Sequence, residues 1–246
     1  MDNSIADNLV VWERNYAWSQ DGDEWTELAH YCNQSYEEWF QSVIHAFVRP
    51  FVRRGDTVLE IAPGHGRWLG LLSMIAAQVI AVDLSSSCIE YCQRRYSDRE
   101  NILFVVNDGR TLREVPDASV NFAFSMEAFV HMEADVIGSY LRELARVLVP
   151  GGIAVIHHAG RSPAALRLRR LRQGPRWQRE LYTVLSQRRL PGQPDGWRSD
   201  VSRHDINRLS GAAGLVMIAQ TQRWGPASAC DARRFNDWIS ILTNPG

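Results

Sequence analysis

The chain has 246 residues, of which 45% are apolar and 22% are charged. This composition fits one globular α/β domain with additions and excludes a disordered or collagen-like chain. The 27 basic and 28 acidic residues leave a formal charge of −1, so no overall field attracts nucleic acid or anionic lipid.

Hydropathy and the first residues predict a cytoplasmic protein. The mean hydropathy is negative, and we find no run of about 18 uncharged apolar residues that could span a membrane. Asp2 and Asp7 stand where a secretory signal would need positive and apolar residues. The four cysteines form no CxxC pair, so we expect them to be reduced. All the basic residues are arginine, and the absence of lysine excludes Schiff-base catalysis and a Walker A loop.

Residues 1–53 are predicted to form an N-terminal helical cap. Apolar and aromatic residues recur every three or four positions from Ser35 to Val52, which indicates an amphipathic helix. The stretch before it is too aromatic for a linker, because it contains Trp12, Tyr16, Trp18, Trp25 and Tyr31.

Residues 54–160 show short β-branched runs that alternate with helical patterns. The predicted strands are 57–61, 78–83, 102–106, 120–125 and 153–157, and the predicted helices are 66–76, 86–96 and 135–148. This alternation implies a parallel sheet wound by right-handed crossovers.

The pattern changes after residue 160. Residues 161–200 are predicted to be an Arg-rich helical lid, because residues 161–191 contain nine arginines and only one acid, Glu180. Residues 201–246 complete the sheet with a helix at 201–213 and strands at 215–223 and 235–242, which should pair antiparallel at the sheet edge. The predicted fold is a Rossmann-like, doubly wound, seven-stranded mixed sheet with the cap at its start and the lid inserted after the fifth strand.

A glycine loop follows the first predicted strand. Gly64 and Gly66 let the backbone approach a ligand beside a helix N-terminus. A dinucleotide fingerprint would want a small residue where Leu69 stands, which disfavours a nicotinamide cofactor. Glu60 precedes the loop, and Asp83 ends the second strand, where an acid suits the hydroxyls of a ribose.

The third strand runs into Asn107-Asp108-Gly109, and Pro150-Gly151-Gly152 precedes the fifth. This ordered set resembles the class I S-adenosylmethionine-dependent methyltransferases, of the bacterial small-molecule O-methyltransferase type that includes sugar enzymes. The resemblance implies S-adenosylmethionine as cofactor. It assigns the methionine part of the cofactor to Glu60, Ala62, Gly64 and Gly66, and the ribose to Asp83 with Leu84 beside it. It assigns the adenine to Asn107, Asp108 and Gly109, and the sulfonium to Ser125. Ala62 departs from the family's usual first glycine, and capping of a turn is the alternative role for Asp108.

Two histidines are predicted as the general base that an alcohol acceptor needs. His131 follows the fourth strand and is the first choice. Side chains alternate along a strand, so only one of His157 and His158 can face the cleft, and His158 is preferred because it lies further out. The alternative for each is a buried, hydrogen-bonded histidine of the core.

The acceptor is predicted to be a small polar molecule, such as a sugar, that contacts Trp25, Tyr36 and Glu127. Aromatic rings suit stacking on a sugar, although they could equally pack the cap on the sheet. Magnesium remains open, and the only grouping of ligands that the sequence offers is Asp200, Asp205, Glu127 and His158.

Three other functions remain as alternatives. They are an RNA methyltransferase, a non-catalytic cofactor-binding regulator and an NAD-dependent dehydrogenase. We expect no membrane partner and no nucleic acid, and the sequence leaves the oligomeric state open.

Overall fold

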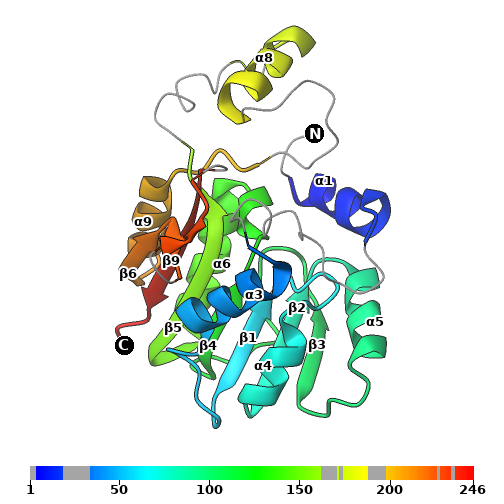
Figure 1. The fold of residues 1–246 in the computed structure, drawn as a ribbon, viewed down its shortest axis with the longest axis vertical. Helices are drawn as coiled ribbons and strands as arrows, with labels where there is room; N and C mark the ends of the chain where they lie inside the picture. Colours follow the sequence, from blue (N-terminus) through cyan, green and yellow to red (C-terminus); the bar gives the residue numbers. More distant parts are fainter. Residues whose placement is uncertain are drawn as a thin grey trace.

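The computed structural model describes residues 4–18, 34–161, 171, 174–187, 198–225, 228–233 and 236–246. Its centre is a seven-stranded sheet in the order β3-β2-β1-β4-β5-β9-β6 (Figure 1). The strands are β1 (Thr57–Ile61), β2 (Gln78–Asp83), β3 (Ile102–Val106), β4 (Val120–Ser125), β5 (Leu148–Ala159), β6 (Val216–Thr221) and β9 (Asp237–Thr243). The strands from β3 to β5 are parallel, and β9 pairs antiparallel with both β5 and β6. The predicted fold class is confirmed.

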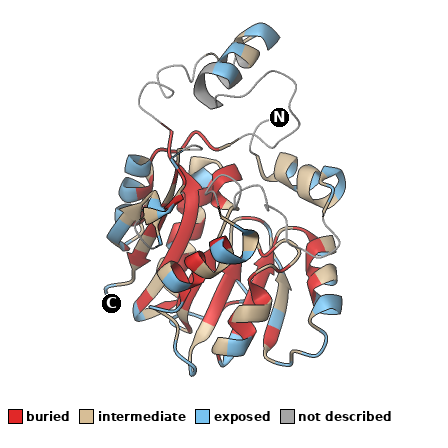
Figure 2. Cartoon of the chain, in the orientation of Figure 1, coloured by how far each residue is buried: buried red, intermediate tan, exposed pale blue. Residues whose placement is uncertain are grey.

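Helices cover both faces of the sheet, because alternate strand residues are apolar on each side. Leu59 and Ile61 pack in one buried cluster with Ile137 and Leu141 of α6. Val58 belongs to the cluster on the other face. The first face carries α6 (Ala134–Val147) and α9 (Arg203–Ala212), and the second carries α3 (Tyr36–Val43), the π-helical turn η2 (Ile44–Val48), α4 (Leu69–Ile75) and α5 (Ser86–Arg95). Figure 2 shows the strands between these layers as mostly buried.

Serine residues begin three of these helices by accepting a hydrogen bond from the first turn. Ser35 caps α3 in a capping box with Glu38, and Ser85 caps α5. Ser202 caps α9, where Asp205 completes the box. Capping satisfies backbone N–H groups that have no partner within the helix.

The fifth strand and the sheet edge differ in detail from the sequence prediction. β5 begins at Leu148, before the predicted start, because Pro150, Gly151 and Gly152 form an irregularity within the strand where its register with β4 shifts. Gly151 takes a φ of 78°, which favours glycine. The connection from β6 to β9 also holds a two-stranded pair, β7 (Arg223–Trp224) and β8 (Cys230–Asp231), which the sequence pattern did not indicate.

The N-terminal segment lies over the end of the sheet where the parallel strands finish. It consists of α1 (Ile5–Val10) and a π-helical turn η1 (Val11–Asn15), above β2, β3 and α5 in Figure 1. In the predicted lid, α8 (Arg176–Gln187) stands apart from the sheet in the same view, and many of the other lid residues lie outside the described ranges. Within the described ranges, none of the helices has the length and apolar character needed to cross a membrane.

Candidate active site

A cavity lies at the carboxyl ends of the parallel strands, beneath the N-terminal segment. The residues that line it come from the glycine loop after β1, the end of β2, the loops after β3 and β4, α5, α6 and the N-terminal segment. Representative members are Gly64, Asp83, Glu127, His131 and Trp12. Ligands of doubly wound sheets bind at this edge, so the cavity is the candidate active site.

The glycine loop takes left-handed backbone at alternate positions. Ala62, Gly64 and Gly66 have φ values of 57°, 56° and 82°. A Cβ atom at residue 66 would lie 2.8 Å from the Tyr96 ring, whose hydroxyl donates a hydrogen bond to the Gly66 carbonyl at 2.7 Å. Gly66 therefore packs against Tyr96 on the side of the loop away from the cavity, whereas Ala62 and Gly64 line the cavity. Ala62 adopts a left-handed conformation that residues other than glycine seldom adopt.

Asp83, which the sequence analysis assigns to a ribose, lies at the end of β2 and lines the cavity. Its carboxylate lines the cavity and accepts hydrogen bonds from the backbone N–H groups of Gly64 at 3.1 Å and Ser85 at 2.9 Å. Burial raises the pKa of Asp83 to about 6, and the backbone hydrogen bonds oppose this shift. The Leu84 backbone N–H also donates to this carboxylate, and since a carboxylate offers about four lone-pair sites, acceptor capacity remains for a ligand hydroxyl.

Glu60 is a buried acid with spare hydrogen-bonding capacity. Its side chain is buried, and its Oε2 atom has no hydrogen-bond partner among the described residues. Burial, together with the charge of Asp83, raises the pKa of Glu60 to about 8, and Arg67 opposes the shift. A buried acceptor of this kind fits a ligand that brings a positive group.

The loop after β3 contributes mainly through its backbone. The Asn107 side chain donates to the Thr111 carbonyl and the Tyr140 hydroxyl, both at 2.9 Å, and accepts from the Gly109 N–H. Asp108 accepts from the N–H groups of Arg110 and Thr111 and so forms the alternative predicted for it, a capped turn. Among the three residues assigned to adenine, Gly109 lines the cavity, along with the neighbouring Leu84.

Ser125 does not line the cavity. Its hydroxyl is fully buried and donates to the Ile61 carbonyl at 2.8 Å, joining the ends of β4 and β1. The expectation that it lies beside the sulfonium is therefore corrected, because its polar atom is used inside the sheet.

His131 lies where the sequence analysis expects it. It ends the short helical turn η3 (Phe129–His131) and lines the cavity with 6% of its surface exposed. Its ring centroid is 5.1 Å from that of Trp12, and its carbonyl accepts a hydrogen bond from Asn8 at 2.9 Å. The N-terminal segment thus packs directly on this histidine.

The structure reverses the preference between the two histidines of β5. His158 is fully buried outside the cavity lining, with its Nε2 2.7 Å from Ser240 Oγ and its Nδ1 2.7 Å from the Ala159 carbonyl. Burial lowers the pKa of His158 to about 3. His157 instead accepts a hydrogen bond from the backbone N–H of Glu127 at 3.1 Å. His158 is a hydrogen-bonded core residue, and the prediction that it faces the cleft is wrong because alternation along β5 directs His157, and not His158, toward Glu127.

The three residues assigned to the acceptor have different outcomes. Glu127 lines the cavity and pairs with Arg67 at 3.1 Å. Tyr36 does not line it, because the face of α3 directs its ring to Trp39 and Phe40, at centroid distances of 5.9 Å. The prediction for Trp25 falls outside the described residues.

The proposed magnesium ligands do not come together. Asp205 caps α9, His158 is bonded within the core, and Asp200 lies 3.9 Å from Arg161. Among the residues that the structure describes, no group of three or more His, Cys, Asp or Glu side chains could hold a metal ion.

Several contacts hold the N-terminal segment on the cavity. Glu13 accepts hydrogen bonds from the hydroxyls of Ser85 and Ser86 at the start of α5. Trp18 stacks on His65 at a centroid distance of 4.3 Å, and His65 stacks on Tyr91 at 3.7 Å. The segment therefore contacts both the glycine loop and the start of α5.

Weakening the contact between Glu13 and the serines of α5 should speed the release of a bound nucleoside. We expect Glu13→Ala to raise the dissociation rate of S-adenosylhomocysteine a few-fold, since exposed charged contacts contribute about 1 kcal/mol or less. Stopped-flow tryptophan fluorescence would measure it, with Arg14→Ala on the same turn as control. Equal rates in the two variants would show that Glu13 does not hold the segment closed.

Comparison with known proteins places this site in a family. Residues 58–152 match the family described as a methyltransferase domain. This match supports the resemblance to the class I S-adenosylmethionine-dependent methyltransferases over residues 58–152. A probable S-adenosylmethionine-dependent methyltransferase of Mycobacterium tuberculosis is 29% identical over 120 residues, which cover 48% of this chain and 41% of that protein. The demethylmenaquinone methyltransferase of Clavibacter sepedonicus is 31% identical over 114 residues, or 46% and 44% of the two chains. The methyltransferase domain thus spans less than half the length of these relatives.

Solved structures agree with the fold over nearly the whole chain. A chain from the complex of the Haloferax volcanii Trm112 methyltransferase activator with a methyltransferase has a TM-score of 0.60 at 21% identity, covering 99% of this chain and 98% of that one. The geranyl diphosphate C-methyltransferase of Streptomyces coelicolor has a TM-score of 0.64 at 12% identity, covering 98% of both chains. At these identities the likeness concerns the fold.

The residues around the cavity fit S-adenosylmethionine. Asp83 and Gly109 line the cavity, and the Asp83 carboxylate suits the ribose hydroxyls. Glu60 does not line the cavity, although its buried Oε2, which has no hydrogen-bond partner among the described residues, is an acceptor of the kind that suits an ammonium group.

Replacing Asp83 with alanine should weaken cofactor binding. We expect a loss of roughly 1–3 kcal/mol, the scale of hydrogen bonds to a charged group. Calorimetry with S-adenosylhomocysteine would measure it, and circular dichroism would check that the variant is folded. Unchanged affinity in a folded variant would remove the ribose assignment.

Proposed function

We propose that this chain transfers a methyl group from S-adenosylmethionine to a hydroxyl group of a small polar molecule such as a sugar. The observation that carries the proposal is one cavity that joins Asp83 and the glycine loop on one side to His131 and Glu127 on the other. Residues suited to binding the cofactor and a candidate proton acceptor thus line the same cavity.

His131 is assigned the role of general base. The cofactor supplies an activated methyl group when it is bound. His131 accepts the proton of the acceptor hydroxyl as the new oxygen–carbon bond forms, and the sulfur–carbon bond breaks to leave S-adenosylhomocysteine. General bases contribute typically ~10²–10⁴-fold to a rate.

The aromatic walls are assigned to orientation and to the exclusion of water. Trp12, Trp18 and Trp68 line the cavity. Apolar ring faces suit stacking on the faces of a sugar ring, and alignment of two reactants can lower a barrier by several kcal/mol.

Labelled methyl transfer tests this function. The chain would be incubated with methyl-labelled S-adenosylmethionine and a bacterial metabolite extract, and the label followed by mass spectrometry. We expect label in a small hydroxyl-bearing compound. Label found only in added RNA, or cofactor binding without any transfer, would overturn the proposal.

A further inference from the structure

Glu127 has a backbone conformation that its side chain does not favour. Its φ is 69°, in the left-handed region where a residue with a Cβ atom is strained. It lines the cavity just beyond β4, whose carboxyl end meets the site. Strain of this kind persists only where the surroundings enforce it, and such positions cluster at functional sites.

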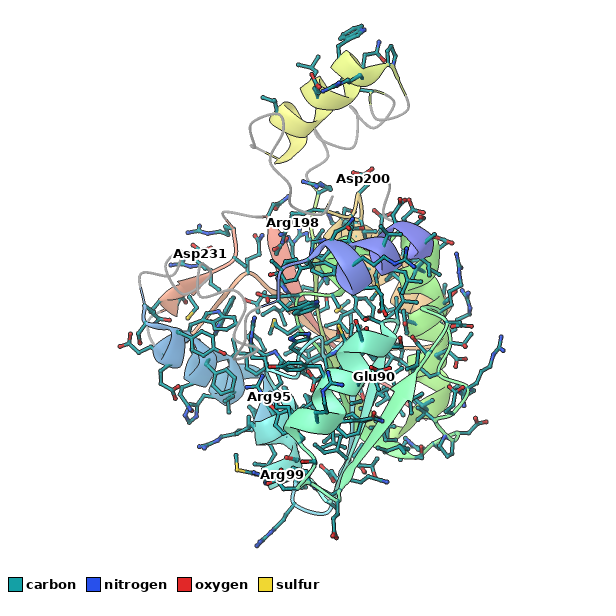
Figure 3. All side chains as sticks on the ribbon, turned by 90° about the vertical axis from the view of Figure 1, so that its right-hand side faces the viewer. Glu90, Arg95, Arg99, Arg198, Asp200 and Asp231 are labelled. Carbon is teal, nitrogen blue, oxygen red and sulfur yellow. The ribbon has the colours of Figure 1, made fainter. Side chains whose placement is uncertain are left out.

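A chain of buried polar groups holds this conformation. The Glu127 N–H donates to His157 Nδ1 at 3.1 Å, and His157 Nε2 lies 3.4 Å from Asp237 Oδ2. Because Nδ1 acts as acceptor, a neutral His157 carries its proton on Nε2, the nitrogen that faces Asp237. Asp237 also pairs with Arg198, which lies on the side of the core that faces α8 in Figure 3.

The chain spans distant parts of the sequence. Asp237 begins β9, which pairs antiparallel with β5, so that residue 159 of β5 lies opposite Asp237. His157 and Asp237 are 6% and 1% exposed. Neither group lines the cavity, so both act on the site through Glu127 alone.

The Glu127 carboxylate is only partly used inside the protein. Its Oε2 pairs with Arg67 at 3.1 Å, whereas Oε1 is buried and has no hydrogen-bond partner among the described residues. The side chain is 9% exposed. A buried carboxylate oxygen without a partner costs free energy, which a ligand donor would recover.

We propose that Glu127 is an acceptor-binding residue, held in place by His157 and Asp237 as positioning residues, and that it selects acceptors with an O–H or N–H donor beside the methylated atom. This inference rests on the proposed function and names the part of the site that recognises the acceptor. Burial raises the pKa of Glu127, and the Arg67 guanidinium beside it opposes this shift by favouring the carboxylate. As a carboxylate, Glu127 can only accept hydrogen bonds. A purely apolar acceptor would leave Oε1 unsatisfied and is disfavoured.

The test compares variants in the labelled-methyl assay with the same metabolite extract as probe. Glu127→Gln keeps the size and the contact to Arg67 but removes the charge. It should lower transfer at least about tenfold, the lower end for a hydrogen bond to a charged group. Affinity for S-adenosylhomocysteine and the melting temperature should stay near those of the wild type. Glu90→Gln, on the exposed face of α5, is the matched control.

Two substitutions of His157 separate positioning from simple packing. His157→Asn retains an oxygen that can accept the Glu127 N–H and should keep most of the transfer. His157→Leu removes the acceptor and should lose transfer to the same extent as Glu127→Gln, with cofactor affinity retained.

Each outcome decides the matter. Label transfer by Glu127→Gln at the rate of Glu90→Gln would overturn the role of Glu127. Equal rates for the Asn and Leu variants of His157 would overturn the positioning chain. If the wild type itself transfers no label, the proposed function fails, and the inference that rests on it fails too.

Discussion

Replacing His131 with alanine should lower the rate of methyl transfer by ~10²-fold or more while leaving cofactor affinity nearly unchanged. The histidine lines the cavity beside Trp12, whereas the groups suited to the cofactor come from the loops after β1, β2 and β3. Removing the imidazole therefore removes a proton acceptor without touching those groups. The labelled-methyl assay gives the rate, and calorimetry with S-adenosylhomocysteine gives the affinity.

Because His131 also packs on Trp12, its replacement could lower the stability of the fold, and the stability of each variant is therefore measured. His131→Phe keeps an aromatic ring against Trp12 and should show the same loss of rate. Full turnover in the alanine variant would mean that His131 is not the base.

Replacing Glu60 with glutamine should stabilise the cofactor-free protein at alkaline pH while weakening cofactor binding. Burial raises the pKa of Glu60 from its ordinary value to about 8. Below the ordinary value, the folded and unfolded states are both protonated. Between the two values only the unfolded state releases its proton, so folding stability falls by up to about 1.4 kcal/mol for each pH unit. Above about pH 8 the loss is complete.

Glutamine has no proton to lose and should remove this dependence. Between pH 5 and pH 8, we expect the free energy of unfolding of the wild type to fall by on the order of 2–4 kcal/mol more than that of Glu60→Gln. Its affinity for S-adenosylhomocysteine should fall, because a nearby ammonium group favours release of the Glu60 proton and glutamine cannot become a carboxylate. Denaturant titrations at the two pH values test the expected change in stability, and calorimetry tests the expected loss of affinity. Parallel pH dependences in the two proteins would contradict the account of Glu60.

The sheet could be predicted from the sequence because its signals are local. β1, β2 and β3 each coincide with a β-branched run and β4 with a run rich in phenylalanine, and the loop after β1 carries its own glycines. β5 is less regular, since the bulge at Gly151 and Gly152 depends on how its register with β4 shifts. A short apolar run does not report that shift.

The site was harder to predict where it depends on partners far apart in sequence. Alternation along β5 shows that His157 and His158 point to opposite sides. Only the contacts made from β9, where Asp237 faces His157 and the Ser240 hydroxyl meets the His158 ring, show which of them is held in the core. Tyr36 and Ser125 have the expected residue types at plausible positions. The face of α3 and the hydrogen bond to Ile61 direct them elsewhere.

Some signals in the sequence were available and not used. Glu127 and Arg67 both follow strands at the cavity edge, and a lone acid and a lone arginine there suggest a pair. The φ of Glu127 has no counterpart in the sequence, because non-glycine left-handed residues leave no compositional mark.

A crystal structure with S-adenosylhomocysteine bound would test the central claim most directly. The account predicts the ligand in the cavity at the ends of β1, β2 and β4, with its ribose hydroxyls on Asp83, its ammonium group toward Glu60, and its sulfur on the side of His131 and Glu127. A ligand bound elsewhere on the chain, or bound here with its ribose away from Asp83, would contradict it.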